Sequence, residues 1–159
     1  MDESIQERLA RLPAYAWRSD PAVPPFPDDR PLIVFDGVCV LCSGFARFVA
    51  ARDRAGAFRF TAAQSPLGQG LYRHFGLDPV NYETNLLLAE GRAFAKLSAF
   101  AEIVSRLGWP WQAGAVVGLV PAWLGDSLYD PIARSRYRIF GQASTCHRPD
   151  ATWRRRMIE

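Results

Sequence analysis

Residues 32–52 read LIVFDGVCVLCSGFARFVAAR and place a short apolar run directly before a helical pattern. The run LIVF is typical of a buried strand, and the Asp-Gly pair that follows it ends the strand. Cys39 and Cys42 then lie at the start of a helix expected over about residues 39–52. The sequence therefore predicts a strand, a tight turn and a helix whose first turn carries a CxxC pair.

The residues that follow predict the rest of a small α/β domain. A strand is expected over residues 58–62, and a helix over residues 66–75 has proline at its first position and glycine after its end. Two further runs flank Glu90 and Gly91 with the two-residue spacing of an antiparallel hairpin. Strands are expected over residues 84–89 and 92–97, and a helix over residues 99–107. The predicted order is β-α-β-α and then β-β-α.

The two ends of the chain are expected to lie outside this unit. The proline-rich beginning predicts a short helix and an extended arm that contributes no core. The stretch 108–141 predicts two helices broken near Pro121 and Gly125. We therefore expect an arm over residues 1–30, one domain with a helical C-terminal cap over residues 31–149, and a basic tail over residues 150–159.

Composition excludes several classes of protein. The chain has 159 residues, of which 49% are apolar and 22% charged, which fits one compact domain with its own core. The net charge is only +3 and the basic residues are scattered, so we expect no nucleic-acid partner. No apolar run approaches the roughly 20 residues of a transmembrane segment, and the acidic start does not resemble a secretory signal. We therefore expect a cytoplasmic protein.

The CxxC pair carries the chemistry that the sequence predicts. Amide groups and the dipole at a helix N-terminus stabilise a thiolate, so a cysteine there is reactive. On a helical projection Cys42 falls within the apolar arc and Cys39 at its edge, so we expect Cys42 to be the more buried sulfur. Cys39 is then the expected nucleophile of thiol-disulfide exchange, and Cys42 the residue that resolves the mixed disulfide. This chemistry needs no cofactor.

Three alternatives to this chemistry stay open. A disulfide between Cys39 and Cys42 would stabilise the fold by only about 2 kcal/mol, against roughly 4.7 kcal/mol for one between Cys42 and Cys146, which disfavours a structural staple. A Cys3His zinc site from Cys39, Cys42, Cys146 and His147 has suitable ligand types but lacks the usual paired spacing. In a non-catalytic binding module, the cysteines would only pack in the core.

Asp36 has two interpretations. As the N-cap of the helix it would accept the backbone N–H of Cys39, which is worth on the order of 1 kcal/mol. As a negative charge near the thiols it would raise their pKa, so Asp36→Asn would lower the pKa of Cys39.

Residues near the C-terminus offer further candidates. Arg134, Arg136 and Arg138 alternate in the sequence and are expected on a solvated face. If one of them folded near Cys39, it would instead suit an anionic thiol such as glutathione. Cys146 is expected to be a small apolar side chain and His147 a surface residue, with a third redox thiol and a thiolate promoter as the alternatives.

The segment FDGVCVLCSGFARFVAARDRAGAFRFTAAQSPLG, residues 35–68, resembles the opening of the DCC-type family, which is named for an Asp, Cys, Cys signature. The similarity continues through EGRAFAKLSAFAEIV and LYDPIARSRYRIFGQASTCHRP and covers about residues 31–149. The family is known as thiol-disulfide oxidoreductases. The resemblance implies a thioredoxin-like fold and assigns the signature to Asp36, Cys39 and Cys42. For thiol-disulfide exchange at Cys39 and Cys42 we expect a disulfide-bearing protein or a low-molecular-weight thiol as substrate, and an unidentified reductant that recycles the protein.

One departure from the thioredoxins concerns the loop before the third strand. Thioredoxins carry a cis-proline there, facing the CxxC, where this chain has Tyr82, Glu83 and Thr84. We therefore expect substrates to be contacted differently.

Overall fold

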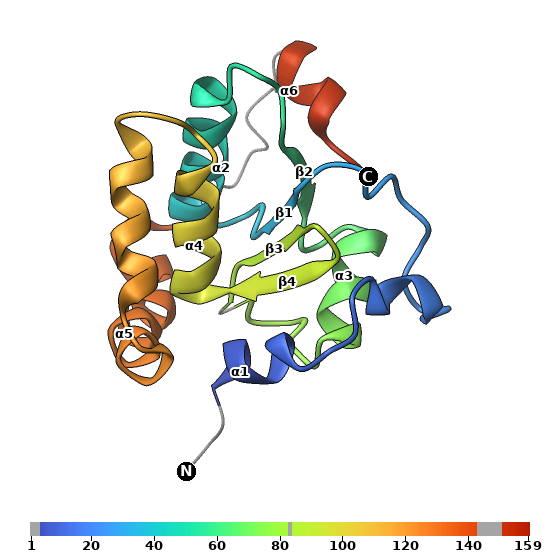
Figure 1. The fold of residues 1–159 in the computed structure, drawn as a ribbon, viewed down its shortest axis with the longest axis horizontal. Helices are drawn as coiled ribbons and strands as arrows, with labels where there is room; N and C mark the ends of the chain where they lie inside the picture. The colour runs from blue at the N-terminus through green and yellow to red at the C-terminus, as the bar shows by residue number, and fades with distance from the viewer. Residues whose placement is uncertain (1–3, 83, 143–150) are drawn as a thin grey trace.

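A four-stranded mixed sheet forms the centre of the computed structural model, which describes residues 4–82, 84–142 and 151–159 (Figure 1). The strands lie in the order β2-β1-β3-β4. β1 and β2 are parallel, whereas β3 is antiparallel to both of its neighbours. Their bounds are β1 Leu32–Phe35, β2 Arg59–Ala62, β3 Leu86–Ala89 and β4 Arg92–Ala95. The predicted order of elements and the thioredoxin-like α/β class are confirmed.

Helices cover both faces of this sheet (Figure 1). α2 and α4 lie on one face with α5 outside them, and α3 lies on the other face. The first half of the chain contains α1 Ile5–Ala10, the short 3-10 helix η1 Ala16–Ser19, α2 Val40–Arg52 and α3 Pro66–His74. The second half contains α4 Lys96–Ser105, the 3-10 helix η2 Trp111–Leu119, α5 Ala122–Phe140 and α6 Ala151–Arg156.

β1 is buried on both of its faces. Leu32 and Val34 belong to the core beneath α3, and Ile33 and Phe35 belong to the core beneath α2 and α4. Successive side chains of a strand point to opposite faces, so a strand covered on both sides needs an apolar residue at every position. This is why the sequence shows a continuous run and not an alternation. The residues that follow β1 therefore lie in a loop at the carboxyl end of this strand.

The N-terminal arm contributes to the core, which corrects the expectation that it lies outside. Leu9, Trp17 and Val23 are buried in the core beneath α3. The Trp17 ring stacks on Phe26, and its indole N–H donates a hydrogen bond of 3.0 Å to Asp28. The prolines hold the arm extended, and the apolar side chains between them cover surface that α3 leaves open.

The C-terminal part contains one long helix after Pro121. α5 is continuous through Gly125, so the expected break near Pro121 is confirmed and the one near Gly125 is wrong. A Cβ added at Gly125 would lie 3.7 Å from Leu97 of α4, which is an ordinary packing distance, so this position tolerates a small side chain. Among the described helices, none is long and apolar enough to cross a membrane.

Segments near the two chain ends occupy the outer edges of the sheet. At β2, the backbone N–H of Ile158 donates to the carbonyl of Phe60 at 2.8 Å. At β4, the Gln6 side chain accepts the backbone N–H of Ala95 at 2.8 Å. Just before β4, the N–H of Tyr15 donates to the carbonyl of Gly91, also at 2.8 Å.

Gly68 is required by the contact of α3 with the chain after β2. A Cβ added there would lie 2.2 Å from the carbonyl oxygen of Ala62, whereas one added at Gly44 on α2 would meet nothing within 4 Å. We therefore expect Gly68→Ala to destabilise the protein by about 2–3 kcal/mol. Gly44→Ala, the matched control, should stabilise it by about 0.5–1 kcal/mol. Urea unfolding of both variants tests this, and equal effects would contradict the close contact.

Candidate functional site

Cys39 and Cys42 lie on the first turn of α2, directly after β1. Cys39 is the N-cap and has an extended backbone, with φ −77° and ψ 121°. Its Sγ accepts the backbone N–H of Cys42 at 3.4 Å. The cap is therefore Cys39 itself, and the expectation that Asp36 caps this helix is wrong. A sulfur that accepts an amide of the first turn is placed where the helix N-terminus favours negative charge.

The burial of the two cysteines is the reverse of the prediction. Cys39 has no exposed surface, whereas Cys42 is half-buried. The helical projection failed because Cys39 precedes the helix and has an extended backbone. In addition, Cys39 pairs in an isolated antiparallel bridge with Gln142, which follows α5 in the chain. Residues far apart in the sequence thus come together over the CxxC turn.

The environment shifts the pKa values of the two thiols in opposite directions. The Cys42 thiol, which donates a hydrogen bond to Cys39 Sγ, is the main cause that lowers the pKa of Cys39 to about 6. The backbone N–H of Cys42 and the charge of Arg136 act in the same direction, and burial opposes them. The pKa of Cys42 is raised by this same hydrogen bond and by burial. Cys39 is therefore mostly thiolate above a pH of about 6 and mostly thiol below it.

Removing the Cys42 thiol should weaken the Cys39 thiolate. We expect Cys42→Ala to raise the pKa of Cys39, because its main hydrogen-bond donor is lost. Cys42→Ser keeps a hydroxyl donor and should raise it less. The measurement is the rate of Cys39 alkylation against pH, followed by mass spectrometry that assigns the modified residue. A profile that does not change in Cys42→Ala would contradict the assigned cause.

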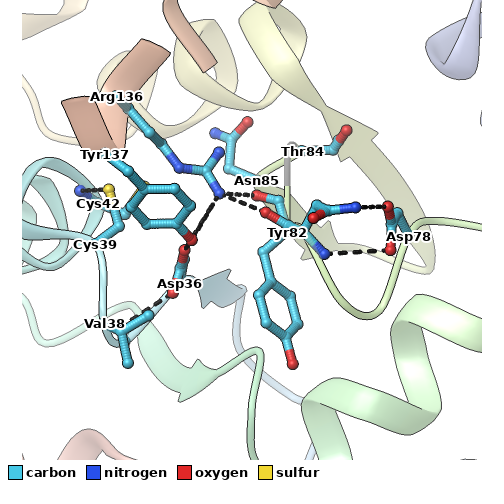
Figure 2. Close-up of polar contacts among 12 residues, drawn as sticks. Asp36, Val38, Cys39, Cys42, Asp78, Tyr82, Thr84, Asn85, Arg136 and Tyr137 are labelled. Carbon is cyan, nitrogen blue, oxygen red and sulfur yellow. Dashed lines mark hydrogen bonds and ion pairs between the residues drawn. The ribbon is translucent and has the colours of Figure 1, made fainter. Parts of the chain in front are cut away.

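Asp36 is enclosed by hydrogen-bond donors from three parts of the chain, of which Figure 2 shows Val38, Arg136 and Tyr137. Its Oδ1 accepts the backbone N–H of Val38 at 3.1 Å and the Gln64 side-chain amide at 2.7 Å. Its Oδ2 accepts the guanidinium of Arg136 at 3.2 Å and the hydroxyl of Tyr137. Asp36 and Arg136 form an ion pair whose side chains are 1% and 3% exposed. The carboxylate thus ties the CxxC turn to α5.

Arg136 reaches this site from the C-terminal half of α5. Its Nη2 also donates to the carbonyls of Asn81 at 2.9 Å and Tyr82 at 2.6 Å, in the segment before β3 (Figure 2). The expectation of a solvated face is therefore wrong for Arg136, although Arg134 and Arg138 are exposed. The guanidinium of Arg136, on α5, therefore binds both the residue that follows β1 and the segment before β3, where thioredoxins carry a cis-proline.

Comparison with known proteins identifies the family of this chain. A model of the DCC1-like thiol-disulfide oxidoreductase family matches residues 33–142, which include Asp36, both cysteines and Arg136. The chain belongs to the DCC1-like thiol-disulfide oxidoreductase family. It is 32% identical over 127 residues to the uncharacterized protein YuxK of Bacillus subtilis, covering 80% of this chain and 93% of that protein.

A plant relative matches over a similar length. The chloroplastic DCC family protein of Arabidopsis thaliana is 31% identical over 144 residues, which cover 90% of this chain and 84% of the relative. No solved structure matches the chain. The sequence-based assignment to the DCC-type family is confirmed, and the matched region includes α5 and Gln142, which pairs with Cys39.

Sequence reasoning missed Tyr137 and Gln64 and assigned Arg136 to solvent. The signal available was Asp36 itself, because a carboxylate directly after a fully buried strand needs partners. The chain has 18 arginines and one lysine, Lys96. Nothing in the spacing of these arginines identifies Arg136 as the partner of Asp36. The partner could be identified only once the fold had placed α5 beside the turn.

Two predicted candidates, Cys146 and His147, lie outside the described residues. The proposed Cys3His zinc site and a third redox thiol therefore stay predictions from the sequence. Within the part of the chain that is described, there is no group of three or more His, Cys, Asp or Glu side chains that could hold a metal ion.

Proposed function

We propose that the protein is a thiol-disulfide oxidoreductase that uses the Cys39/Cys42 dithiol. The observation that supports this most directly is the pairing at the start of α2, where Cys39 Sγ accepts the Cys42 N–H at 3.4 Å and the pKa of Cys39 is lowered to about 6. A thiolate is the nucleophile of disulfide exchange, and a second thiol one turn away can resolve the product. Membership of the DCC1-like family supports the same class of reaction.

In the first proposed step, the Cys39 thiolate attacks one sulfur of a substrate disulfide. A Cys39–substrate disulfide forms as the substrate S–S bond breaks, and the leaving sulfur departs as a thiolate that takes a proton from solvent. The helix N-terminus and the Cys42 donors hold the attacking charge before the reaction. A low pKa keeps the nucleophile in its reactive form near neutral pH.

In the second proposed step, Cys42 resolves the mixed disulfide. Once Cys39 is bonded to the substrate it no longer carries the charge that raises the pKa of Cys42, so the Cys42 thiol loses its proton more easily. Cys42 then attacks Cys39 Sγ and releases the second substrate thiol. The substrate gains two electrons and two protons, and the protein is left with a Cys39–Cys42 disulfide that an unidentified thiol reductant returns to the dithiol.

The burial of Cys39 adds a requirement to this cycle. Because Cys39 has no exposed surface, a local rearrangement must uncover Sγ before a substrate disulfide can contact it. Small disulfides should therefore react before bulky ones.

The partners that we propose are a disulfide-bearing protein or a low-molecular-weight thiol. We propose the cytoplasm as the place of the cycle, because a reducing compartment returns the Cys39/Cys42 pair to the dithiol form.

The test is to trap the first intermediate with a model peptide disulfide. Cys42→Ser cannot resolve the mixed disulfide and should accumulate it on Cys39, as identified by mass spectrometry. The reduced parent protein should instead convert to the Cys39–Cys42 disulfide, with a reversible midpoint potential between those of thioredoxin and protein disulfide isomerase, roughly −270 to −180 mV. If the mixed disulfide forms on Cys42 in a Cys39→Ser variant and never on Cys39, the proposed order of attack is wrong.

A non-catalytic binding module is the second candidate, because two observations favour it. Cys39 is fully buried, and large apolar side chains are exposed on the C-terminal part, with Trp109, Leu119 and Trp123 at 81%, 82% and 70%. In that case the cysteines only pack, and the exposed face contacts a partner. The midpoint measurement separates the two candidates, since a protein in which the Cys39–Cys42 bond never forms cannot complete the proposed two-cysteine cycle.

A further inference from the structure

The exchange steps described above do not explain why two opposite charges are buried beside the CxxC turn. The ion pair of Asp36 and Arg136 is almost completely enclosed, so solvent and salt screen it little. A pair of this kind is often no better for stability than apolar residues of the same size. Its position next to the reactive turn therefore calls for a functional reason.

We propose that Asp36 and Arg136 act on the Cys39/Cys42 dithiol as opposed charges, with Arg136 stabilising the thiolate and Asp36 limiting that stabilisation. The proposal rests on the proposed function, since it concerns the same dithiol. Arg136 is thus a positioning residue for thiol chemistry, supplied by α5. Figure 2 shows its guanidinium pointing toward Asp36 and the carbonyls that precede β3.

The contacts of the guanidinium support an electrostatic role. The bonds to Asp36, Asn81, Tyr82 and Tyr137 all come from Nη2. Among the described residues, the buried Nε of Arg136 has no hydrogen-bond partner. A purely structural arginine–carboxylate contact commonly uses two parallel hydrogen bonds. Here Nη2 makes all of these bonds, so the acceptors around the guanidinium neutralise only part of its delocalised positive charge.

The position of Asp36 supports the opposing role. Its Oδ1 accepts the N–H of Val38, the residue directly before Cys39, so the carboxylate is fixed against the reactive turn. The charge of Arg136 lowers the pKa of both Cys39 and Cys42, and the charge of Asp36 raises the pKa of Cys42. Because the carboxylate is fixed against the turn that carries Cys39, we expect its charge to oppose the Cys39 thiolate as well. Removing the charge of Arg136 should therefore raise the pKa of Cys39, and removing the charge of Asp36 should lower it.

The effect of each charge on the pKa of Cys39 can be measured without any disulfide substrate. The rate of Cys39 alkylation is followed against pH in Asp36→Asn, Arg136→Met and the double variant. At a pH of about 6 we expect Arg136→Met to react about threefold to tenfold more slowly than the parent protein, and Asp36→Asn to react faster. The double variant should lie between the two single variants. Arg138→Met removes the same charge from an exposed position of α5 and should not change the profile.

Several outcomes would overturn the proposal. Shifts of the same sign in both single variants would indicate general loosening of the turn, and an unchanged profile in a folded Arg136→Met would exclude the charge effect. If Arg136→Met does not fold, the double variant, in which both buried charges are removed, is compared with Asp36→Asn, and the double variant should react more slowly. Failure of the proposed function is distinguishable, because Cys42→Ser would then trap no mixed disulfide while the alkylation profiles still shift.

Discussion

Cys39→Ser should lower the rate at which the protein reduces a model disulfide by at least about a thousandfold, because serine provides no thiolate at neutral pH. The fold should be kept, since serine is close in size to cysteine and its oxygen can still accept the Cys42 N–H at the helix N-cap. The assay is steady-state reduction of a small disulfide in the presence of excess reductant.

A matched control lies on the same helix. Gly44→Ala changes an exposed position of α2 that meets nothing within 4 Å, so its rate should stay within about twofold of the parent rate. Unchanged turnover in Cys39→Ser would remove Cys39 from the mechanism. Loss of turnover together with a mixed disulfide on Cys42 would reverse the roles of the two cysteines.

Asp36→Ala should reduce the free energy of unfolding by about 3–5 kcal/mol. The substitution leaves the buried guanidinium of Arg136 without its counter-charge, and it also removes the acceptor for Gln64, Tyr137 and the Val38 N–H. Urea unfolding followed by circular dichroism measures the loss. This change should be among the largest that a single polar residue of the described chain can produce.

The control for this effect is an exposed ion pair. Asp29 lies 2.8 Å from Arg59 but is 60% exposed, so Asp29→Ala should cost less than about 1 kcal/mol. High salt should leave the difference between the two variants largely unchanged, because the Asp36 pair is buried. A loss below about 1 kcal/mol in Asp36→Ala would show that Arg136 has found other partners.

Local patterns were sufficient to predict the central elements of the fold. The apolar run of β1 and the two-residue hairpin between β3 and β4 depend on short-range rules, and both were predicted within two residues of their bounds. Failures occurred where the tertiary structure overrides local propensity. Gly125 does not break α5, because one glycine inside a helix costs only about 1 kcal/mol, which the packing of α5 against α4 outweighs.

The candidate site was only partly predictable for a similar reason. The family signature identifies Asp36, Cys39 and Cys42 in the sequence, but the partners of Asp36 lie 28 residues away at Gln64 and 100 residues away at Arg136. Burial of Cys39 was also missed, because Gln142 pairs with it from the other end of the domain. Contacts over such separations depend on how helices pack, which residue spacing alone does not encode.

The covered edges of the sheet have a consequence for molecular recognition. Open edge strands recruit extended peptides from other molecules, either as bound ligands or as the first contact of an aggregate. Here β2 is paired with the chain around Ile158, and β4 is contacted by Gln6. Lengthening the sheet with a strand from another molecule would first require displacing one of these segments, and trimming either of them by proteolysis would expose an unpaired edge strand.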